Sequence, residues 1–84
     1  MELDCGIPIK RIVAWLEDEL GLSLQDGMWE YRGEGMCRIA LEPLESRELG
    51  MVSIERACMR VEGDKSAMSD FMRLFTLRFM SAGG

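Results

Sequence analysis

Residues 51–79 read MVSIERACMRVEGDKSAMSDFMRLFTLRF, and their hydrophobic period changes at Gly63-Asp64. Before this pair, Ala57, Met59 and Val61 recur at every second position, which is typical of a β-strand. After it, apolar residues recur at spacings of three and four, as they do on one face of an α-helix. These residues are Met68, Phe71, Met72, Phe75 and Phe79. The stretch therefore predicts a strand over residues 51–62 followed by a helix over residues 65–80.

Two features of this stretch leave alternatives open. Val52 and Ile54 have the opposite parity to the other apolar residues of the strand, which indicates either a β-bulge near Glu55-Arg56 or apolar residues on both faces. Residues 74–79 also alternate, so they could form a strand, but the longer helical series favours a helix. Asp64 or Ser66 is a suitable residue to cap this helix.

A second helix is expected near the start of the chain, over residues 7–20. Its apolar stripe is formed by Ile9, Ile12, Val13, Leu16 and Leu20. Pro8 suits the first turn, and Gly21 follows the last residue of the stripe, where a left-handed cap is common. Leu22 is then expected to fold back onto Leu16.

The middle of the chain predicts two further strands. Asp26-Gly27 is a turn signal that precedes a short aromatic strand over residues 28–32. Gly33 and Gly35 flank a tight turn, and residues 36–42 alternate as a half-buried strand does. Pro43 either ends this strand or places it at an edge. The segment LESRELG, residues 44–50, is expected to be a polar connection.

These elements predict an α+β fold in the order α-β-β-β-α. Sequential strands with short turns pair most simply as an antiparallel meander, so the sheet has three strands and two helices cover one face. The 84 residues form a single domain, 1–84, with a small core. The order resembles that of the double-stranded RNA-binding domain at the level of topology. That domain presents lysines to phosphates at the start of its last helix, where this chain has the single Lys65 beside Asp64.

Composition and charge exclude several classes of function. The chain has 10 Lys+Arg against 15 Asp+Glu, a net charge of −5, which does not favour nucleic-acid binding. No apolar run has the length of a membrane-spanning helix, and the first ten residues do not read as a secretory signal. We therefore expect a soluble protein of the cytoplasm that binds neither nucleic acid nor membranes.

The side chains that usually carry chemistry are scarce. There is no histidine, and the three cysteines, Cys5, Cys37 and Cys58, have no metal-ligand spacing. We expect them to be reduced and mostly buried. The sequence thus predicts no catalytic, cofactor-binding or metal-binding residue, and no enzyme.

Two short segments suggest an alternative role as a carrier. Cys5 lies in LDCGIP, just before the first helix, where the helix dipole would favour a thiolate. This segment resembles the entry to the first helix of the TusA/SirA sulfur-carrier family, although the Cys-Pro pair of that family is missing. The end of the chain, Gly83-Gly84, is similar to that of ubiquitin-like sulfur carriers, in which the tail follows a final β-strand. Either segment would make the chain a sulfur or acyl-adenylate carrier.

The leading functional hypothesis is a small, non-enzymatic interaction module that self-associates, as a homodimer, with a further protein partner possible. Two helices and three strands leave a surplus of apolar residues: Trp15, one set from the strand over residues 51–62, and Leu74 with Leu77. Large exposed apolar patches usually mark interfaces. Arg56 and Arg60 could bind an anion, but ordinary pairing with Glu30, Glu42 or Glu55 is favoured.

Overall fold

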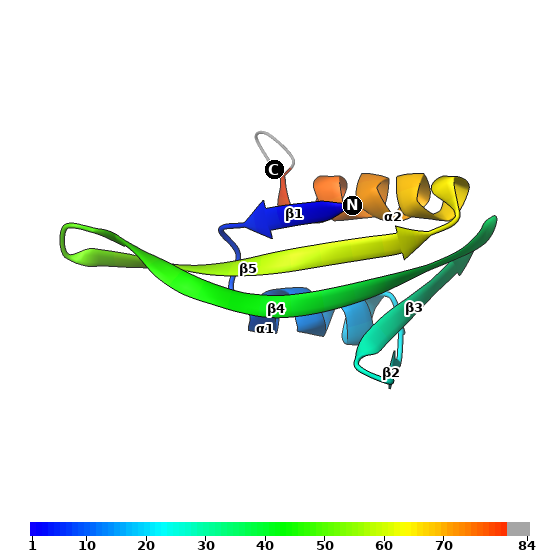
Figure 1. Cartoon of the computed structure of the whole chain (residues 1–84), viewed down its shortest axis with the longest axis horizontal. Helices are drawn as coiled ribbons and strands as arrows, with labels where there is room; N and C mark the ends of the chain where they lie inside the picture. The colour runs from blue at the N-terminus through cyan, green and yellow to red at the C-terminus, as the bar shows by residue number, and fades with distance from the viewer. Residues whose placement is uncertain (81–84) are drawn as a thin grey trace.

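A computed structural model of the chain describes residues 1–80, which form an α+β fold with two helices, a π-helical segment and five strands (Figure 1). In chain order the elements are β1 (Glu2–Cys5), α1 (Ile9–Ala14), η1 (Trp15–Glu19), β2 (Leu24–Gln25), β3 (Met28–Gly33), β4 (Gly35–Leu49), β5 (Val52–Gly63) and α2 (Lys65–Phe79).

The sheet has five antiparallel strands in the order β1-β5-β4-β3-β2, so the prediction of three strands is wrong in number. The predicted meander corresponds to β3, β4 and β5. The prediction omitted β2 and β1, which lie at the two edges of the sheet. Because β1 precedes the first helix, the order α-β-β-β-α, on which the likeness to the double-stranded RNA-binding domain depended, does not hold.

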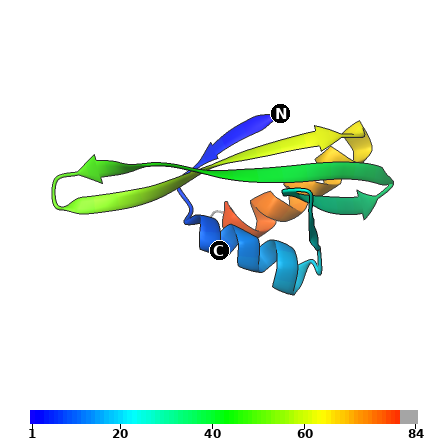
Figure 2. The ribbon, with the colours of Figure 1, turned by 60° about the horizontal axis from the view of Figure 1, so that its bottom comes forward.

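Both helices cover the same face of the sheet, as predicted (Figure 2). The register aligns apolar side chains across the strands on this face: Leu3 and Leu41 both lie opposite Met59, and Trp29 and Val61 both lie opposite Ile39. Phe71 and the other inward residues of α2 pack over these rows and exclude water from them. Burial of this apolar area is the main force that holds the two layers together.

The first helix starts at Ile9 and changes at Trp15 into the π-helical η1. Trp15 was expected to be left outside the core, but it is only 4% exposed. Its ring lies 5.5 Å from that of Phe71 and 5.4 Å from that of Phe79, centroid to centroid. At the end of η1, Gly21 has φ +69° and the Leu22 N–H donates to the Leu16 carbonyl over 2.9 Å. The predicted fold-back onto Leu16 is thus present.

The last helix, α2, confirms the helical interpretation of residues 74–79. Asp64 occupies the N-cap position, but its side chain does not cap the helix. The Asp64 carboxylate instead accepts a hydrogen bond of 2.9 Å from the Met36 N–H. Ser66 donates from its hydroxyl to the Glu34 carbonyl, so it does not cap α2 either. The predicted caps therefore fasten the β3–β4 turn to the start of α2.

Candidate interaction site

A two-stranded arm, residues 43–56, projects beyond the rest of the sheet (Figures 1 and 2). It is formed by the second half of β4, the turn at Gly50-Met51 and the first half of β5. The expectation that residues 44–50 are a connection is wrong. β4 continues through Pro43 to Leu49, and residues 49 and 52 pair across the two-residue turn.

Pro43 is tolerated inside β4 because the strand has only one neighbour there. β3 pairs with β4 between Gly35 and Ile39, and beyond that point β4 pairs with β5 alone. A proline, which cannot donate a backbone hydrogen bond, is accommodated at such an edge. Of the two options that the sequence left open, an edge position is therefore the one adopted.

Of the two alternatives that the sequence left open for β5, a bulge near Glu55-Arg56 is wrong, and apolar residues on both faces is the one adopted. The arm does contain a β-bulge, but on β4. Leu44 pairs with Arg56 and Arg47 with Ile54, so the register shifts between them. Two residues of β4 therefore lie opposite the single Glu55 of β5, and the extra residue belongs to β4. Bulges bend and twist a strand and are common at sheet edges. Because β5 itself keeps a regular alternation, Val52 and Ile54 lie on the face opposite to Ala57 and Met59.

The end of the arm carries three large apolar side chains that are exposed. Leu49 is 52% exposed, Val52 59%, and Met51 is fully exposed. These are three of the seven large apolar side chains that are exposed within residues 1–80; the others, Met1, Leu24, Leu77 and Met80, lie elsewhere. The cross-strand pair Leu49–Val52 shares a face with Ile54, which is half-buried. An isolated two-stranded hairpin is at best marginally stable in water, so the arm would gain stability from a binding partner. A cluster of exposed apolar side chains is also typical of an interface.

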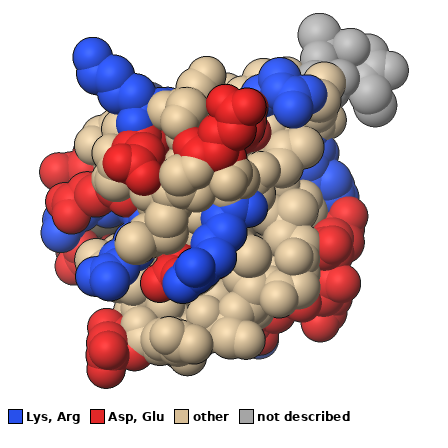
Figure 3. Space-filling model, turned by 90° about the vertical axis from the view of Figure 1, so that its right-hand side faces the viewer, with Lys and Arg blue, Asp and Glu red and all other residues tan. Residues whose placement is uncertain are grey.

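The uncovered face of the sheet is mainly charged. Arg56 lies 3.4 Å from Asp4, and Arg60 lies 3.9 Å from Glu2, so both arginines pair with β1. Cross-strand pairing was expected, but with partners other than these, because β1 was not predicted as a strand. Such exposed pairs contribute little to stability. On the side of the molecule seen in Figure 3, acidic and basic side chains lie next to one another.

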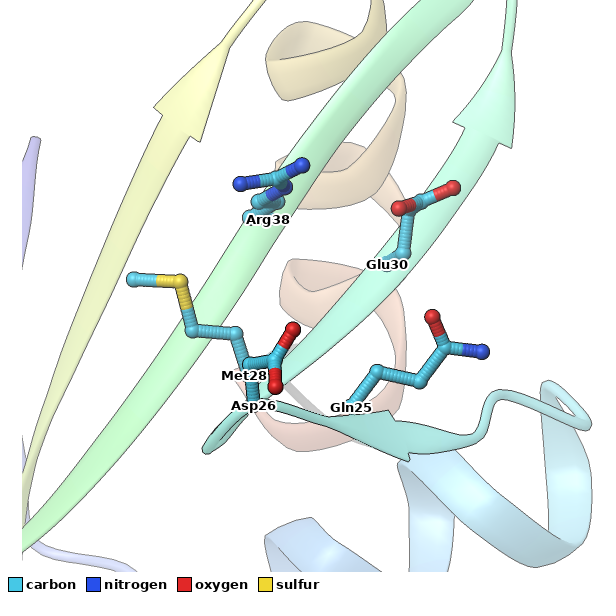
Figure 4. A pocket seen from close by; sticks show the side chains of 5 residues that line it. All are labelled: Gln25, Asp26, Met28, Glu30 and Arg38. Atoms are coloured by element: carbon cyan, nitrogen blue, oxygen red, sulfur yellow. The ribbon is translucent and has the colours of Figure 1, made fainter.

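A small hollow on this face is lined by Gln25, Asp26, Met28, Glu30 and Arg38 (Figure 4). Its volume is about 140 Å³, well below the roughly 300–1,000 Å³ of a typical ligand pocket. Glu30 lies opposite Arg38 in the register and receives a hydrogen bond from Arg32 over 2.7 Å. The set contains no nucleophile beside a base, so it offers no arrangement for covalent catalysis.

The three thiols are free and buried, as expected, and none is poised to react. Cys5 was expected to tend toward a thiolate, but burial, followed by the nearby Cys58 and Asp4, raises its pKa. The residue ends β1 with its side chain in the core, and the helix begins only at Ile9. The pKa of Cys58 is also raised, by desolvation and then by its contact with Glu2.

Other residues singled out in the sequence have separate positions. Leu77 is 60% exposed on α2, and Leu74 is half-buried against the core. Gly83 and Gly84 lie outside the described residues. Within residues 1–80, no three His, Cys, Asp or Glu side chains are grouped closely enough to hold a metal ion. None of the helices in that part of the chain combines the length and the apolar content needed to cross a membrane.

No protein-family model matches this chain, and neither curated protein sequences nor solved structures give a significant match.

Proposed function

We propose that this protein is a small, non-enzymatic interaction module that self-associates through its arm, residues 43–56. The observation that carries the proposal is the exposed apolar end formed by Leu49, Met51 and Val52. Leu49 and Val52 lie on the face of the sheet away from both helices, and neither helix extends under the arm (Figure 2). Within the described chain these two side chains and Met51 therefore remain exposed. Contact with a second surface would remove them from water and stabilise the arm.

The nature of the surface favours a protein partner. The chain has a net charge of −5, and the charged side chains of the uncovered sheet face pair with each other along β1 and β5. A nucleic-acid site instead requires a cationic surface that displaces counterions from phosphates. Three free, buried thiols fit a reducing compartment, so we place the module in the cytoplasm.

The alternative function, a sulfur or acyl-adenylate carrier, has weaker support. Burial of Cys5 and its raised pKa disfavour a nucleophilic role for that thiol. Residues Lys65–Phe79 form α2, whereas the ubiquitin-like carriers have a strand as their last element before the tail. The carrier hypothesis therefore depends on Gly83 and Gly84 alone.

Light scattering coupled to size exclusion tests self-association. At micromolar concentration the wild-type chain should have twice its monomer mass of 9.5 kDa. The double variant Met51→Ser, Val52→Ser should be monomeric with an unchanged circular-dichroism spectrum, because both side chains are exposed and contribute nothing to the core. Leu77→Ser is the matched control, since it removes a similarly exposed side chain from α2 and should remain dimeric. A monomer mass that is independent of concentration in the wild type would disprove self-association.

A further inference from the structure

We propose that the second copy of this chain pairs with the free edge of β5, antiparallel and centred on Ser53. In this arrangement Val52 of one copy lies opposite Ile54 of the other, twice over, and the two Ser53 residues face each other. The proposal rests on the self-association proposed above and adds to it the strand, the direction and the register.

The free edge lies at the start of β5. Met1 and β1 cover β5 only between Ala57 and Val61. Residues 52–56 therefore pair with β4 on one side and, within residues 1–80, with no strand on the other. Unpaired backbone groups at a sheet edge are a template for a further strand. The outer edge of β4 is a poorer template, because Pro43 lacks a donor and the bulge between Leu44 and Arg47 breaks the regular spacing of the ladder.

The direction of the backbone groups identifies the residues that would bond. The Val61 N–H donates to the Met1 carbonyl over 2.8 Å, and the Val61 carbonyl accepts from the Met1 nitrogen over 3.0 Å, so both groups of Val61 face the β1 side. Residues of the same parity along a regular strand face the same way. The N–H and C=O groups of Ser53 and Glu55 therefore face the free edge, where β1 is absent.

The position of β1 limits the possible registers. Cys5 occupies the place opposite Ala57, and the chain then turns away through Gly6. A partner strand centred on Ile54 would place its Met51 opposite Ala57, where Cys5 already lies. Centring on Glu55 would bring two carboxylates face to face, which is destabilising. Centring on Ser53 avoids both conflicts.

The Ser53-centred register is also favourable for the side chains. It places apolar Val52 beside apolar Ile54 and sets no like charges opposite each other within residues 52–55. The two arms then form a four-stranded ribbon, β4-β5-β5-β4. Leu49, Val52 and Ile54 share one face of each arm, so six apolar side chains meet on the ribbon and shield each other from water.

Disulfide trapping tests the register. In a hydrogen-bonded antiparallel pair, opposite Cα atoms are about 5.5 Å apart, within the roughly 4.4–6.8 Å range of disulfides. Ser53→Cys should therefore give a covalent dimer of twice 9.5 kDa on mild oxidation. Glu48→Cys is the control: Glu48 lies opposite Ser53 on the same arm, but the two copies of residue 48 would be about 14 Å apart, three strand spacings. Wild type controls for the native thiols.

The outcomes separate the two proposals. A covalent dimer of Ser53→Cys, with Glu48→Cys remaining monomeric on a non-reducing gel, supports the pairing. If light scattering gives a dimer but Ser53→Cys cross-links no more than Glu48→Cys, the pairing is wrong and self-association stands. Efficient cross-linking of Ile54→Cys in place of Ser53→Cys would also overturn the proposed register. A monomer at all concentrations overturns both proposals.

Discussion

The indole nitrogen of Trp29 donates a hydrogen bond of 3.0 Å to a carboxylate oxygen of Glu17. Trp29 lies on β3 with 7% of its surface exposed, and Glu17 lies on η1, so the bond joins the sheet to the π-helical segment. Buried indole N–H groups usually have a partner, and leaving one unpaired is costly. This polar contact therefore adds to the core packing of Trp15 and Leu16 in holding η1 on the sheet.

Glu17→Ala should lower the free energy of unfolding by about 1–3 kcal/mol, because the buried indole N–H loses its acceptor. The neighbouring Asp18 is exposed on the same segment, so Asp18→Ala should change stability by less than about 0.5 kcal/mol. Urea unfolding followed by tryptophan fluorescence measures both. Equal stability of the two variants would show that the hydrogen bond does not contribute.

Leu16→Ala and Phe75→Ala should each lower the free energy of unfolding by about 2–5 kcal/mol, because each leaves a cavity in a packed core. Both side chains are fully buried. Leu77 is exposed on the same helix as Phe75, so Leu77→Ala should have little effect. Thermal unfolding checks the series. A midpoint unchanged by either core substitution would contradict the position of that helix.

Gly63→Ala should destabilise the fold far more than Gly50→Ala. Both glycines have positive φ, +140° and +64°, where other residues are strained. A Cβ at Gly63 would also lie 2.6 Å from the Cys37 Cα, whereas one at Gly50 would meet nothing within 4 Å. Gly50→Ala should therefore cost about 1–2 kcal/mol from backbone strain alone. If chemical denaturation shows a similar loss of unfolding free energy for the two variants, the close approach of Gly63 to Cys37 is refuted.

Stability should fall at alkaline pH partly through Cys37. Burial, with a smaller effect of Asp64, raises its pKa above the ordinary 9.0. The unfolded thiol ionises near pH 9 while the folded one keeps its proton, so this contribution is full below pH 9 and is lost as pH rises toward the raised pKa. Unfolding free energy measured at pH 8 and pH 10 should drop more in wild type than in Cys37→Ala. Identical drops would exclude the thiol as the cause.

Deleting Gly83 and Gly84 should leave the fold and self-association unchanged. The helix α2 ends at Phe79, and the Met80 N–H already bonds to the Thr76 carbonyl over 2.9 Å, so the described end of the helix does not depend on the two glycines. Circular dichroism and light scattering test this expectation. A cellular defect in the deletion strain, with both measurements unchanged, would favour the carrier function.

Periodicity alone located the helices and strands that are long enough to show a repeated apolar face in their own sequence. α2 was predicted because Phe71 and Phe75 recur on one face, and the inward set of β5 because Ala57, Met59 and Val61 alternate. β1 was missed because its four residues form a strand only by hydrogen bonding to β5, which lies more than fifty positions later in the chain. In principle, the inward alternation of Leu3 and Cys5 was its signal, but four residues are too few to distinguish a strand from an extended lead into a helix.

The arm was missed for a different reason. Whether a strand continues past Pro43 depends on whether a neighbouring strand needs a backbone donor at this position, because proline has no N–H. That depends on where β3 ends, which the sequence does not show. The polar residues Glu45 to Glu48 also match a loop as well as an exposed two-stranded ribbon. Trp15 was placed outside the core because helical periodicity assumes 3.6 residues per turn, whereas the wider π-helical segment brings both Trp15 and Leu16 inward.

The pairing of β1 with β5 requires a long loop to close during folding. Glu2 lies opposite Arg60, so this strand pair joins the start of the described chain to the strand that precedes its last helix. Loop-closure entropy must be overcome before such a pairing stabilises anything, and chains rich in non-local contacts fold slowly for their size. The N-terminal strand has no hydrogen-bonded neighbour other than β5 within residues 1–80. β1 can therefore join the sheet only after β5 has formed. This order favours a single cooperative transition over stepwise assembly from the N-terminus.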